Sequence, residues 1–495
     1  MRYILSIDQG TTGSRAFIFD KRGRIVSSAY KEFRQIYPKA GWVEHSADEI
    51  WRSVESVVKT AVIKAHAAPG DIAAIGITNQ RETTVLWDRK TSRPVHNAIV
   101  WQCRRTSDIC DRLKSKGYEG IFRRKTGLVI DAYFSGTKIK WLLDNVKGLK
   151  NRAARGDICF GTIDSWLIWK LTGGKAHVTD HTNASRTLVF DIRNKRWDTR
   201  LLKILGIPKK ILPKVLPSGS VFGETAKGAC GLAGGIPIAG VAGDQQAALF
   251  GQGCFNPGEM KNTYGTGCFL LLNTGSRFIS SKKGLLVTLG CDSKGRPVYV
   301  LEGSVFIAGA AVQWLRDELK LITDAAESGR LAGRVSDTNG VYFVPAFVGL
   351  GAPYWDPSAR GMICGITRGA GRSYIVRAAL EAIAYQVKDV VGAMEKETSR
   401  RIRRLRVDGG AASNDFLMQF QADILNADIV RPEVTETTAK GAAMLAGLTV
   451  GFWKSNSEFK EALKIGKVFR PRMKDKRRRA LYAGWIKAME RARYR

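Results

Sequence analysis

The chain has 495 residues, of which 44% are hydrophobic and 25% charged, as in an ordinary globular protein. Because a single hydrophobic core stops growing at about 250–300 residues, we expect two or more domains. The first apolar run, of about five residues, is too short for a signal peptide, and no apolar run approaches the ~18–20 residues of a membrane-spanning helix. We therefore expect a protein that is neither secreted nor inserted in a membrane.

The net charge is unusually positive, with 79 Lys and Arg against 45 Asp and Glu, a balance of +34. Such a surface can bind nucleic acid or another polyanion. The basic residues are spread along the chain, with short runs at 400–406 and 474–479, and no RNA-recognition, zinc-finger or helix-turn-helix motif accompanies them. We favour a solvated basic surface over a specific nucleic-acid site, so no nucleic-acid partner is predicted.

The eight cysteines are scattered along the chain and form no C-x-x-C pair. This spacing argues against a zinc site and against a disulfide framework. It favours the reducing environment of the cytoplasm.

The N-terminal segment predicts a β-hairpin with a glycine-rich tip. Apolar runs at 3–7 and 15–20 flank the sequence DQGTTGS at 8–14, and neither run has the period of a helix. Backbone N–H groups and hydroxyls at such a tip are the donors that phosphate oxygens need, and Asp8 offers a carboxylate oxygen suited to Mg²⁺. The segment is not a Walker A loop, which requires G-x-x-x-x-G-K-[ST]. Taken alone, it could also be an ordinary hairpin tip.

The rest of the first half alternates helix-like and strand-like segments, which indicates the α/β class. We expect a helix at 47–65, a strand at 72–77, a hairpin-like stretch at 83–87 and a helical region around Trp141 and Leu143. A buried strand beginning at 236 leads through a glycine turn to Asp244, and a helix is predicted to begin at Gln246.

The second half begins with the same design as the N-terminus. Strands at 260–264 and 268–272 flank a Gly-Thr-Gly turn, and a strand at 405–408 runs through a Gly-Gly turn into a helix at 415–425. Small residues at 303–313 lead into a further helix, for which tight helix packing is at least as plausible as a binding role. We predict two related halves, 1–246 and 247–495, that face each other across a cleft closed by a hinge motion.

Two carboxylates fit the needs of phosphoryl transfer, which depends on a metal ligand, phosphate-binding loops and a base for the acceptor's proton. Asp8 and Asp244 each follow a strand, where the backbone is rigid and the side chain can point into a cleft. Asp244 could equally be the N-cap of the helix that follows it.

Polar and aromatic residues near the first strands suggest a site for a small hydroxylated molecule. Arg81 and Glu82 place a cation beside a carboxylate, a pair that can bind several hydroxyls. Trp101, Tyr133 and Phe269 could form an apolar wall, although aromatic side chains more often belong to the core. The pair at 177 and 181 has the i, i+4 spacing of histidine metal ligands, but no third ligand is placed by motif, so a packed or solvated pair is favoured.

Together these segments resemble the FGGY carbohydrate kinases, a family with the fold of actin, sugar kinases and Hsp70 ATPases. The match runs almost end to end. The motifs that carry it lie at 41–45 (GWVEH), 78–83 (TNQRET), 98–105 (AIVWQCRR), 133–138 (YFSGTK), 242–250 (AGDQQAALF), 262–267 (NTYGTG), 349–355 (GLGAPYW) and 406–410 (RVDGG).

The resemblance implies two ribonuclease-H-like domains and ATP-dependent phosphorylation of glycerol to sn-glycerol 3-phosphate. Within the family, the Arg81-Glu82 pair favours glycerol over a ketose or another polyol, which remains the alternative. Asp244 corresponds to the general base, and Asp8 and Asp244 to the ligands of Mg²⁺. The glycerol-binding set carried over from the family is Arg81, Glu82, Trp101, Tyr133, Asp244, Gln245 and Phe269. The positions that match nucleotide-binding residues are Thr11, Thr12, Gly13, Arg15, Thr266, Gly309, Gln313, Gly410 and Asn414.

The resemblance also implies a cytoplasmic homodimer or homotetramer, but the sequence departs from the family in its regulatory positions. The glycine-rich loop at 231–236 lacks the arginine with which some bacterial members bind fructose bisphosphate, and no histidine lies between 188 and 243 for regulatory phosphorylation. We therefore do not carry either form of regulation over to this chain.

Overall fold

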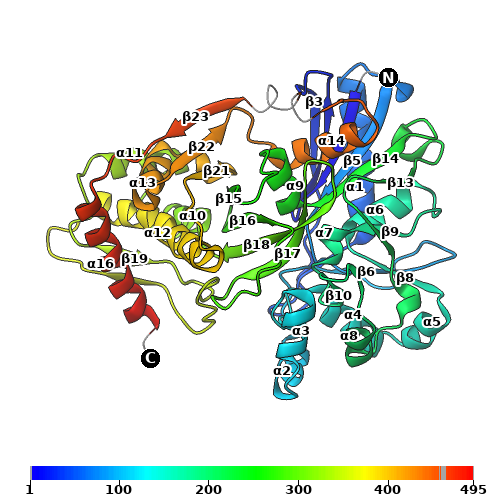
Figure 1. The fold of residues 1–495 in the computed structure, drawn as a ribbon, viewed down its shortest axis with the longest axis horizontal. Coiled ribbons are helices and arrows are strands. Elements are labelled where there is room, and N and C mark those ends of the chain that lie inside the picture. Colours follow the sequence, from blue (N-terminus) through cyan, green and yellow to red (C-terminus); the bar gives the residue numbers. More distant parts are fainter. Residues whose placement is uncertain (1–2, 456–457, 459–463, 494–495) are drawn as a thin grey trace.

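The chain folds around two large mixed sheets, and the computed structural model describes residues 3–455, 458 and 464–493 (Figure 1). The first sheet has six strands in the order β13-β14-β5-β1-β2-β3. Its strands are β1 (Tyr3–Gln9), β2 (Gly13–Phe19), β3 (Ile25–Glu32), β5 (Ile72–Asn79), β13 (Val221–Glu224) and β14 (Pro237–Gly243). The central strands β1, β5 and β14 are parallel, and β5 is buried at every position, as expected for a strand covered on both faces.

The second sheet has seven strands in the order β17-β18-β16-β15-β21-β22-β23. Its strands are β15 (Met260–Tyr264), β16 (Cys268–Gly275), β17 (Leu286–Cys291), β18 (Pro297–Val305), β21 (Arg404–Asp408), β22 (Asp428–Pro432) and β23 (Ile465–Phe469). In the first sheet, antiparallel β3 pairs with β2 on one side of the β1–β2 hairpin, and parallel β5 pairs with β1 on the other. The second sheet repeats this arrangement, with antiparallel β18 beside β16 and parallel β21 beside β15. The shared order confirms that the two halves repeat one design.

Helices cover both sheets and build the regions around them. Those that pack against the first sheet are α1 (Ala47–Lys64), α6 (Ile163–Leu171), α7 (His181–Ala184), α9 (Asp244–Gly251) and α14 (Thr437–Thr449). Those of the second half are α10 (Gly309–Asp317), α11 (Ala325–Gly333), α12 (Arg372–Thr398), α13 (Asp415–Leu425) and α16 (Asp475–Arg493). A lobe below the first sheet holds α2 (Ser107–Ser115), α3 (Glu119–Thr126), α4 (Ser135–Asn145), α5 (Leu149–Arg155) and α8 (Thr199–Leu205).

Short strands pair outside the two large sheets. These pairs are β4 (Glu44–His45) with β7 (Ala98–Ile99), β6 (Val85–Asp88) with β8 (Ile158–Gly161), β9 (Val178–Asp180) with β12 (Lys214–Leu216), β10 (Phe190–Asp191) with β11 (Arg196–Trp197), and β19 (Tyr342–Val344) with β20 (Met362–Cys364). The stretch predicted as hairpin-like at 83–87 thus contributes a strand whose sheet partner, β8, lies far along the sequence.

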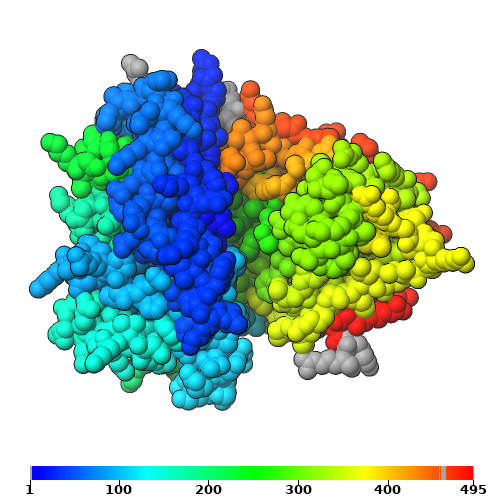
Figure 2. Space-filling view, turned by 180° about the vertical axis from the view of Figure 1, so that it is seen from behind, coloured from blue at the N-terminus to red at the C-terminus, as the bar shows by residue number. Residues whose placement is uncertain are grey.

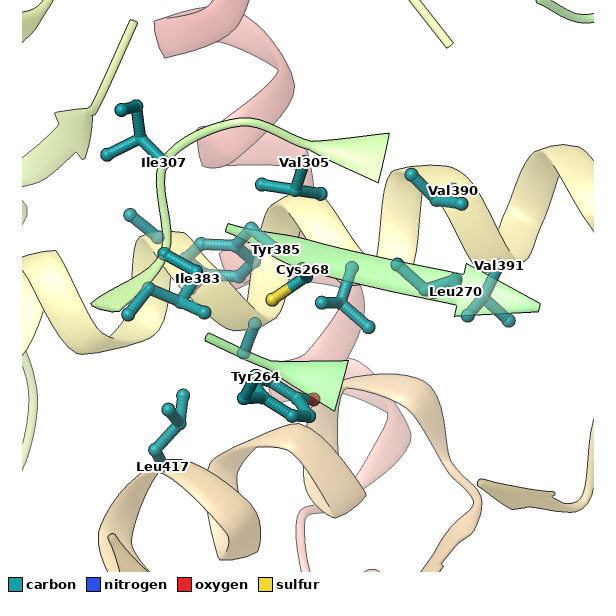
Figure 3. Close-up of a cluster of buried hydrophobic side chains, with 14 of the residues drawn as sticks. Tyr264, Cys268, Leu270, Val305, Ile307, Ile383, Tyr385, Val390, Val391 and Leu417 are labelled. Carbon is teal, nitrogen blue, oxygen red and sulfur yellow. The ribbon is translucent and has the colours of Figure 1, made fainter. Parts of the chain in front are cut away.

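The core of the second half lies between its sheet and α12 and α13. Tyr264 and Leu270 from the sheet meet Ile383 and Tyr385 from α12, with Leu417 of α13 on the other side (Figure 3). This packing fixes the sheet against the helices that flank the cavity described below.

Helix α14 follows β22 in the sequence of the second half, yet it packs on β1, β5 and β14 of the first sheet and on α9 (Figure 1). The approach depends on glycines. A Cβ at Gly76 would lie 2.2 Å from the carbonyl oxygen of Ala442, and one at Gly441 would lie 1.9 Å from that of Ala247. Seen from behind, this segment sits against the first half at the top of a hollow between the two halves (Figure 2).

Several predicted elements are confirmed. The helix expected at 47–65 is α1, capped by the Ser46 side chain, and the helix expected at 415–425 is α13, capped by Asn414. The helix expected from Gln246 begins two residues earlier, at Asp244. None of the helices in the described ranges is both long enough and apolar enough to span a membrane.

Candidate functional site

The first hairpin lies at the edge of a cavity of about 190 Å³ between the two halves. Asp8 lies near the end of β1, and the tip that follows is closed by a hydrogen bond from the Gly10 N–H to the Gly13 carbonyl. A Cβ at Gly13 would lie 2.8 Å from the Lys31 carbonyl oxygen and 2.5 Å from the ring of Tyr30, so the hairpin favours glycine there. The cavity is lined by Asp8, Gly10, Thr12, Gly13, Arg15, Tyr30, Asp244, Gln245 and Thr438.

Asp244 is the first residue of α9 and not its cap. The N-cap position is Gly243, and the Asp244 carboxylate turns toward the cavity, where Oδ1 accepts the Gln245 N–H at 2.7 Å. The reading of Asp244 as a helix N-cap is therefore wrong. Its side chain is 34% exposed, enough to be reached by a ligand.

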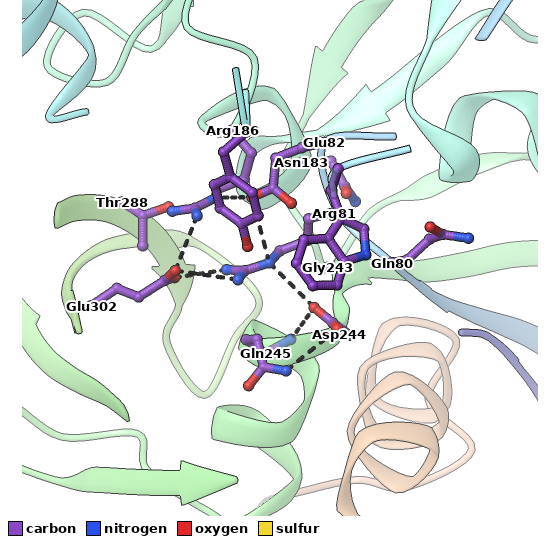
Figure 4. Close-up of polar contacts among 12 residues, drawn as sticks. Gln80, Arg81, Glu82, Asn183, Arg186, Gly243, Asp244, Gln245, Thr288 and Glu302 are labelled. Carbon is purple, nitrogen blue, oxygen red and sulfur yellow. Dashed lines mark hydrogen bonds and ion pairs between the residues drawn. The ribbon is translucent and has the colours of Figure 1, made fainter. Parts of the chain in front are cut away.

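Arg81 links Asp244 to the second half of the chain. Its Nη1 and Nη2 donate to the two carboxylate oxygens of Glu302 at 2.7 and 3.2 Å, and its Nε lies 3.2 Å from Asp244 Oδ1 (Figure 4). A further bond joins Nη1 to the side-chain oxygen of Gln246 at 3.3 Å. The guanidinium is almost fully buried, so these contacts fix its plane.

Arg186 completes a closed set of ion pairs. Its Nε donates to Glu82 Oε1 at 2.5 Å and its Nη2 to Glu302 Oε1 at 3.0 Å, while Arg81 Nε lies 3.9 Å from Glu82 Oε1 (Figure 4). We call Arg81, Glu82, Arg186 and Glu302 the buried ring. Burial alone would raise the pKa of Glu302, but the two arginines bring it down to about 2.

The aromatic residues predicted as a wall lie beside the ring. Trp101 and Tyr133 meet edge to face at 5.6 Å, and the Arg186 guanidinium lies 5.6 Å from the Tyr133 ring centre. Trp101 Nε1 donates to the Thr11 hydroxyl at 3.0 Å, which ties this wall to the first hairpin. Burial raises the pKa of Tyr133, so its hydroxyl stays protonated.

Phe269 reaches the same region from the second sheet. It pairs across β16 and β18 with Ser304, and across β15 and β16 with Thr263. Cross-strand partners share a face and alternate residues return to it, so Phe269 lies on the face that carries Glu302 and Lys261. No ring contact joins Phe269 to the Trp101–Tyr133 pair in the described part of the chain.

Lys261 is a fully buried cation on that face. Its Nζ donates to the Gln245 side-chain oxygen and to the Thr263 hydroxyl, the latter at 2.7 Å. The Gln245 amide in turn donates to Asp244 Oδ2 at 3.3 Å. Burial lowers the pKa of Lys261 to about 8.

The second hairpin opens onto a larger cavity of about 760 Å³, within the range of sites for small molecules. Its walls come from the β15–β16 turn, from α10 and α11, and from the loop that leads into α13. Five of the predicted nucleotide-binding residues line it: Thr266, Gly309, Gln313, Gly410 and Asn414. The other four, Thr11, Thr12, Gly13 and Arg15, belong to the first hairpin.

A divalent cation fits the carboxylates of the smaller cavity. Burial raises the pKa of Asp8 to about 7, with Arg15 opposing the rise and Asp244 adding to it, as expected for a buried carboxyl that lies near a second carboxylate. The described residues hold no cluster of three or more metal-binding side chains. Mg²⁺ is commonly held by one or two carboxylates with phosphates and water, so the pair suffices.

The histidine pair is packed, as favoured from the sequence. His177 meets the ring of Trp87 edge to face at 5.5 Å, and His181 meets Phe190 at 5.9 Å. All eight cysteines are described and none forms a disulfide.

Glu302, Arg186 and Lys261 were not predicted from the sequence. Glu302 is the one charged residue in the otherwise apolar and small sequence PVYVLEGSV of β18. A carboxylate inside such a strand must find a partner, and this was the signal that could have revealed it.

Comparisons with known proteins agree with this architecture. The N-terminal domain of the FGGY family of carbohydrate kinases matches residues 3–251, and the C-terminal domain of that family matches 260–450. The chain is 60% identical over 492 residues to glycerol kinase 2 of Thermotoga maritima, covering 99% of both chains. It is 59% identical over 491 residues to the glycerol kinase of Caldanaerobacter subterraneus, covering 99% of this chain and 98% of the relative. The solved structure of Plasmodium falciparum glycerol kinase with ADP superposes with a TM-score of 0.95 at 39% identity, covering 100% of this chain and 99% of that one.

Two mixed sheets of one design, in two halves with a hollow between them, define the fold of the actin-like ATPases (Figure 2). Both halves of the described chain match one family within that class, in the order of its N- and C-terminal domains. The chain belongs to the FGGY family of carbohydrate kinases. The family and the fold predicted from the sequence are thereby confirmed.

Proposed function

We propose that the protein transfers the γ-phosphoryl group of ATP to the terminal hydroxyl of glycerol, giving sn-glycerol 3-phosphate and ADP. Curated relatives near 60% identity over almost the whole chain are glycerol kinases, which supports this substrate. The observation that carries the proposal is the position of Asp244. Its carboxylate contacts Arg81 of the buried ring and lines the same cavity as Asp8 and the first hairpin.

The polar groups around the buried ring that can still form hydrogen bonds suit a small polyol. Within the described chain, Glu82 Oε2 and the Tyr133 hydroxyl make no hydrogen bond, and Arg81 Nη2 donates only one. Each hydroxyl of glycerol can donate once and accept twice. Glu82 would accept from a hydroxyl and Arg81 would donate to one, while Trp101, Tyr133 and Phe269 would cover the carbon edge.

Asp244 would act as the general base. As the acceptor oxygen attacks the γ-phosphorus and the bond to ADP breaks, the hydroxyl proton passes to the Asp244 carboxylate. A strong base is not required, because proton loss can follow bond formation to a metaphosphate-like phosphoryl group. Gln245 would hold this carboxylate in place through its backbone and side-chain N–H groups.

ATP would span the two cavities, with residues of both contacting it. Thr11, Thr12, Gly13 and Arg15 on one side and Thr266 on the other would donate to the phosphates. Gly309, Gln313, Gly410 and Asn414 would form the walls around the remainder of the nucleotide. Asp8 and Asp244 would hold Mg²⁺, which when bound neutralises phosphate charge.

We extend the proposal to the setting of the enzyme. It acts in the cytoplasm as a homodimer or homotetramer, its two domains divide near residue 247, and nucleic acid is not a partner. The mass from light scattering at low micromolar concentration tests the assembly, because a monomer would contradict it.

The test of the function is ADP release with MgATP and each of glycerol, dihydroxyacetone, xylulose, ribulose or no acceptor. We expect glycerol-dependent turnover, and a loss of about 10²–10⁴-fold in Asp244→Asn with nucleotide binding retained. The control is Asp111→Asn, since Asp111 is exposed on α2, where its carboxylate lies 3.9 Å from Lys114. Turnover with a ketose alone would overturn the substrate, and full activity of Asp244→Asn would overturn the base.

A further inference from the structure

Glu302 is a buried charge whose presence needs an explanation. It lies in β18 of the second half, is fully buried, and occupies a strand of otherwise apolar and small residues. Burying a carboxylate costs free energy unless charged partners satisfy it, and a hydrophobic residue would fill the space at lower cost. Stability of the sheet therefore does not account for a glutamate at this position.

The contacts of Glu302 determine how Arg81 can be used. Both carboxylate oxygens are engaged by the Arg81 fork at 2.7 and 3.2 Å. This two-point contact fixes the plane of the guanidinium, and it directs Nε toward Asp244 at 3.2 Å. A single hydrogen bond to Glu302 would leave the guanidinium free to rotate, and Nε would then no longer be directed toward Asp244.

The same carboxylate also sets Glu82 through Arg186. Arg186 Nη2 donates to Glu302 Oε1, and its Nε holds Glu82 Oε1, so Glu82 Oε2 is left for another donor (Figure 4). Arg81, Glu82 and Arg186 all belong to the first half, where no described carboxylate other than Glu82 and Asp244 contacts either arginine. The orientation of Arg81 and Glu82, which belong to the first half, thus depends on Glu302 of the second half.

We propose that Glu302 is a positioning residue for the acceptor: it orients Arg81 and, through Arg186, Glu82, so that both present their open groups to the hydroxyls of the substrate. The inference rests on the proposed function, because it assigns Arg81 and Glu82 to the acceptor. It predicts that changes at Glu302 weaken use of glycerol and leave use of MgATP almost unaffected.

The experiment measures KM for glycerol and for MgATP in Glu302→Gln and Glu302→Asp. The first keeps the shape and removes the charge. The second keeps the charge that the arginines need and moves it back by one methylene, so it reports on position even if the first variant does not fold. We expect KM for glycerol to rise about 10-fold or more in each folded variant, while KM for MgATP changes less than about threefold.

Glu381→Gln is the matched control. Glu381 is another buried carboxylate of the second half, paired with Arg377 at 2.7 Å on α12 and away from the ring. It should leave the ratio of the two KM values unchanged. Equal changes in both KM values for the Glu302 variants, or a wild-type ratio in Glu302→Asp, would overturn the proposal.

Measurements on the wild-type enzyme distinguish a failure of the proposed function from a failure of the proposed role of Glu302. If it turns over a different acceptor, the proposed substrate is wrong, and the same KM ratio is measured with that acceptor. If it turns over glycerol and the ratio does not move in the variants, only the role of Glu302 fails.

Discussion

At the scale of single residues, a chain of hydrogen bonds reaches Asp244 from the second sheet. Lys261 Nζ donates to the Gln245 side-chain oxygen, which leaves the Gln245 amide to donate to Asp244 Oδ2. The Asp244 carboxylate can only accept and therefore takes the N–H₂ end of the Gln245 amide, and Lys261, which can only donate, holds the oxygen end in place on the other side. Lys261 would therefore position the base without touching substrate.

Replacing Lys261 with methionine tests this role. Methionine is unbranched and only one atom shorter than lysine but cannot donate, so we expect kcat to fall by about 10-fold, part of the 10²–10⁴-fold that general base catalysis contributes. Steady-state kinetics at saturating glycerol and MgATP gives the value. Lys388→Met serves for comparison, because Lys388 is half-buried, donates to the Ile424 carbonyl, and lies on α12. A similar loss of kcat in both variants would contradict the positioning role.

At the scale of elements, the crossing of α9 and α14 joins the two halves. Gly441 of α14 lies so close to α9 that a Cβ would be 1.9 Å from the Ala247 carbonyl oxygen. The Cβ would be held rigidly by the backbone of α14 and the oxygen belongs to the backbone of α9, so neither atom can move alone and the helices would have to separate. α9 begins with Asp244, so the crossing also fixes the position of the base.

Gly441→Ala should accordingly destabilise the protein by at least about 2 kcal/mol through overpacking. Gly392→Ala is the counterpart in α12, where a Cβ would meet nothing within 4 Å. There the higher helix propensity of alanine should stabilise by up to about 1 kcal/mol. Denaturant titration of both variants measures the free energy of unfolding, which should fall in Gly441→Ala and rise in Gly392→Ala. Equal effects of the two substitutions would show that the crossing tolerates a side chain.

Local patterns explain which elements were predictable. The start of α13 was found because a strand at 405–408 runs through a Gly-Gly turn just before it, and Asp8 and Asp244 were found because each stands at the end of a strand next to a glycine turn. Glu302 pairs with Arg81 across 221 residues of sequence, and no local pattern reports such a contact. The placement of α14 on the first sheet was missed for the same reason, since helical periodicity says which face is buried but not against what.

At the scale of the whole molecule, the net charge of +34 gives the protein a field that attracts anions. The two substrates of the proposed reaction differ in this respect, since MgATP is anionic and glycerol is neutral. Salt shortens the range of the field to about 10 Å at 0.1 M and about 3 Å at 1 M. The positive charge should thus increase the association rate of MgATP but not that of glycerol.

Raising NaCl from about 0.05 to 0.5 M should reduce kcat/KM for MgATP several-fold and leave kcat/KM for glycerol nearly constant. Initial rates with one substrate varied and the other saturating supply both values. The neutral substrate is the internal reference, because general effects of salt on the enzyme act on both. A parallel decline of the two values would assign the salt effect to the enzyme and not to attraction of the nucleotide.

The position of α14 also has a consequence for how the protein is made. The ribosome completes β14 at Gly243, but the helix that covers β1, β5 and β14 ends only at Thr449. At about 5–20 residues per second, those roughly 200 residues take about 10–40 s to synthesise. During that interval the apolar face of the first sheet lacks its native cover, so the nascent N-terminal half is a natural client for chaperones until translation is almost finished.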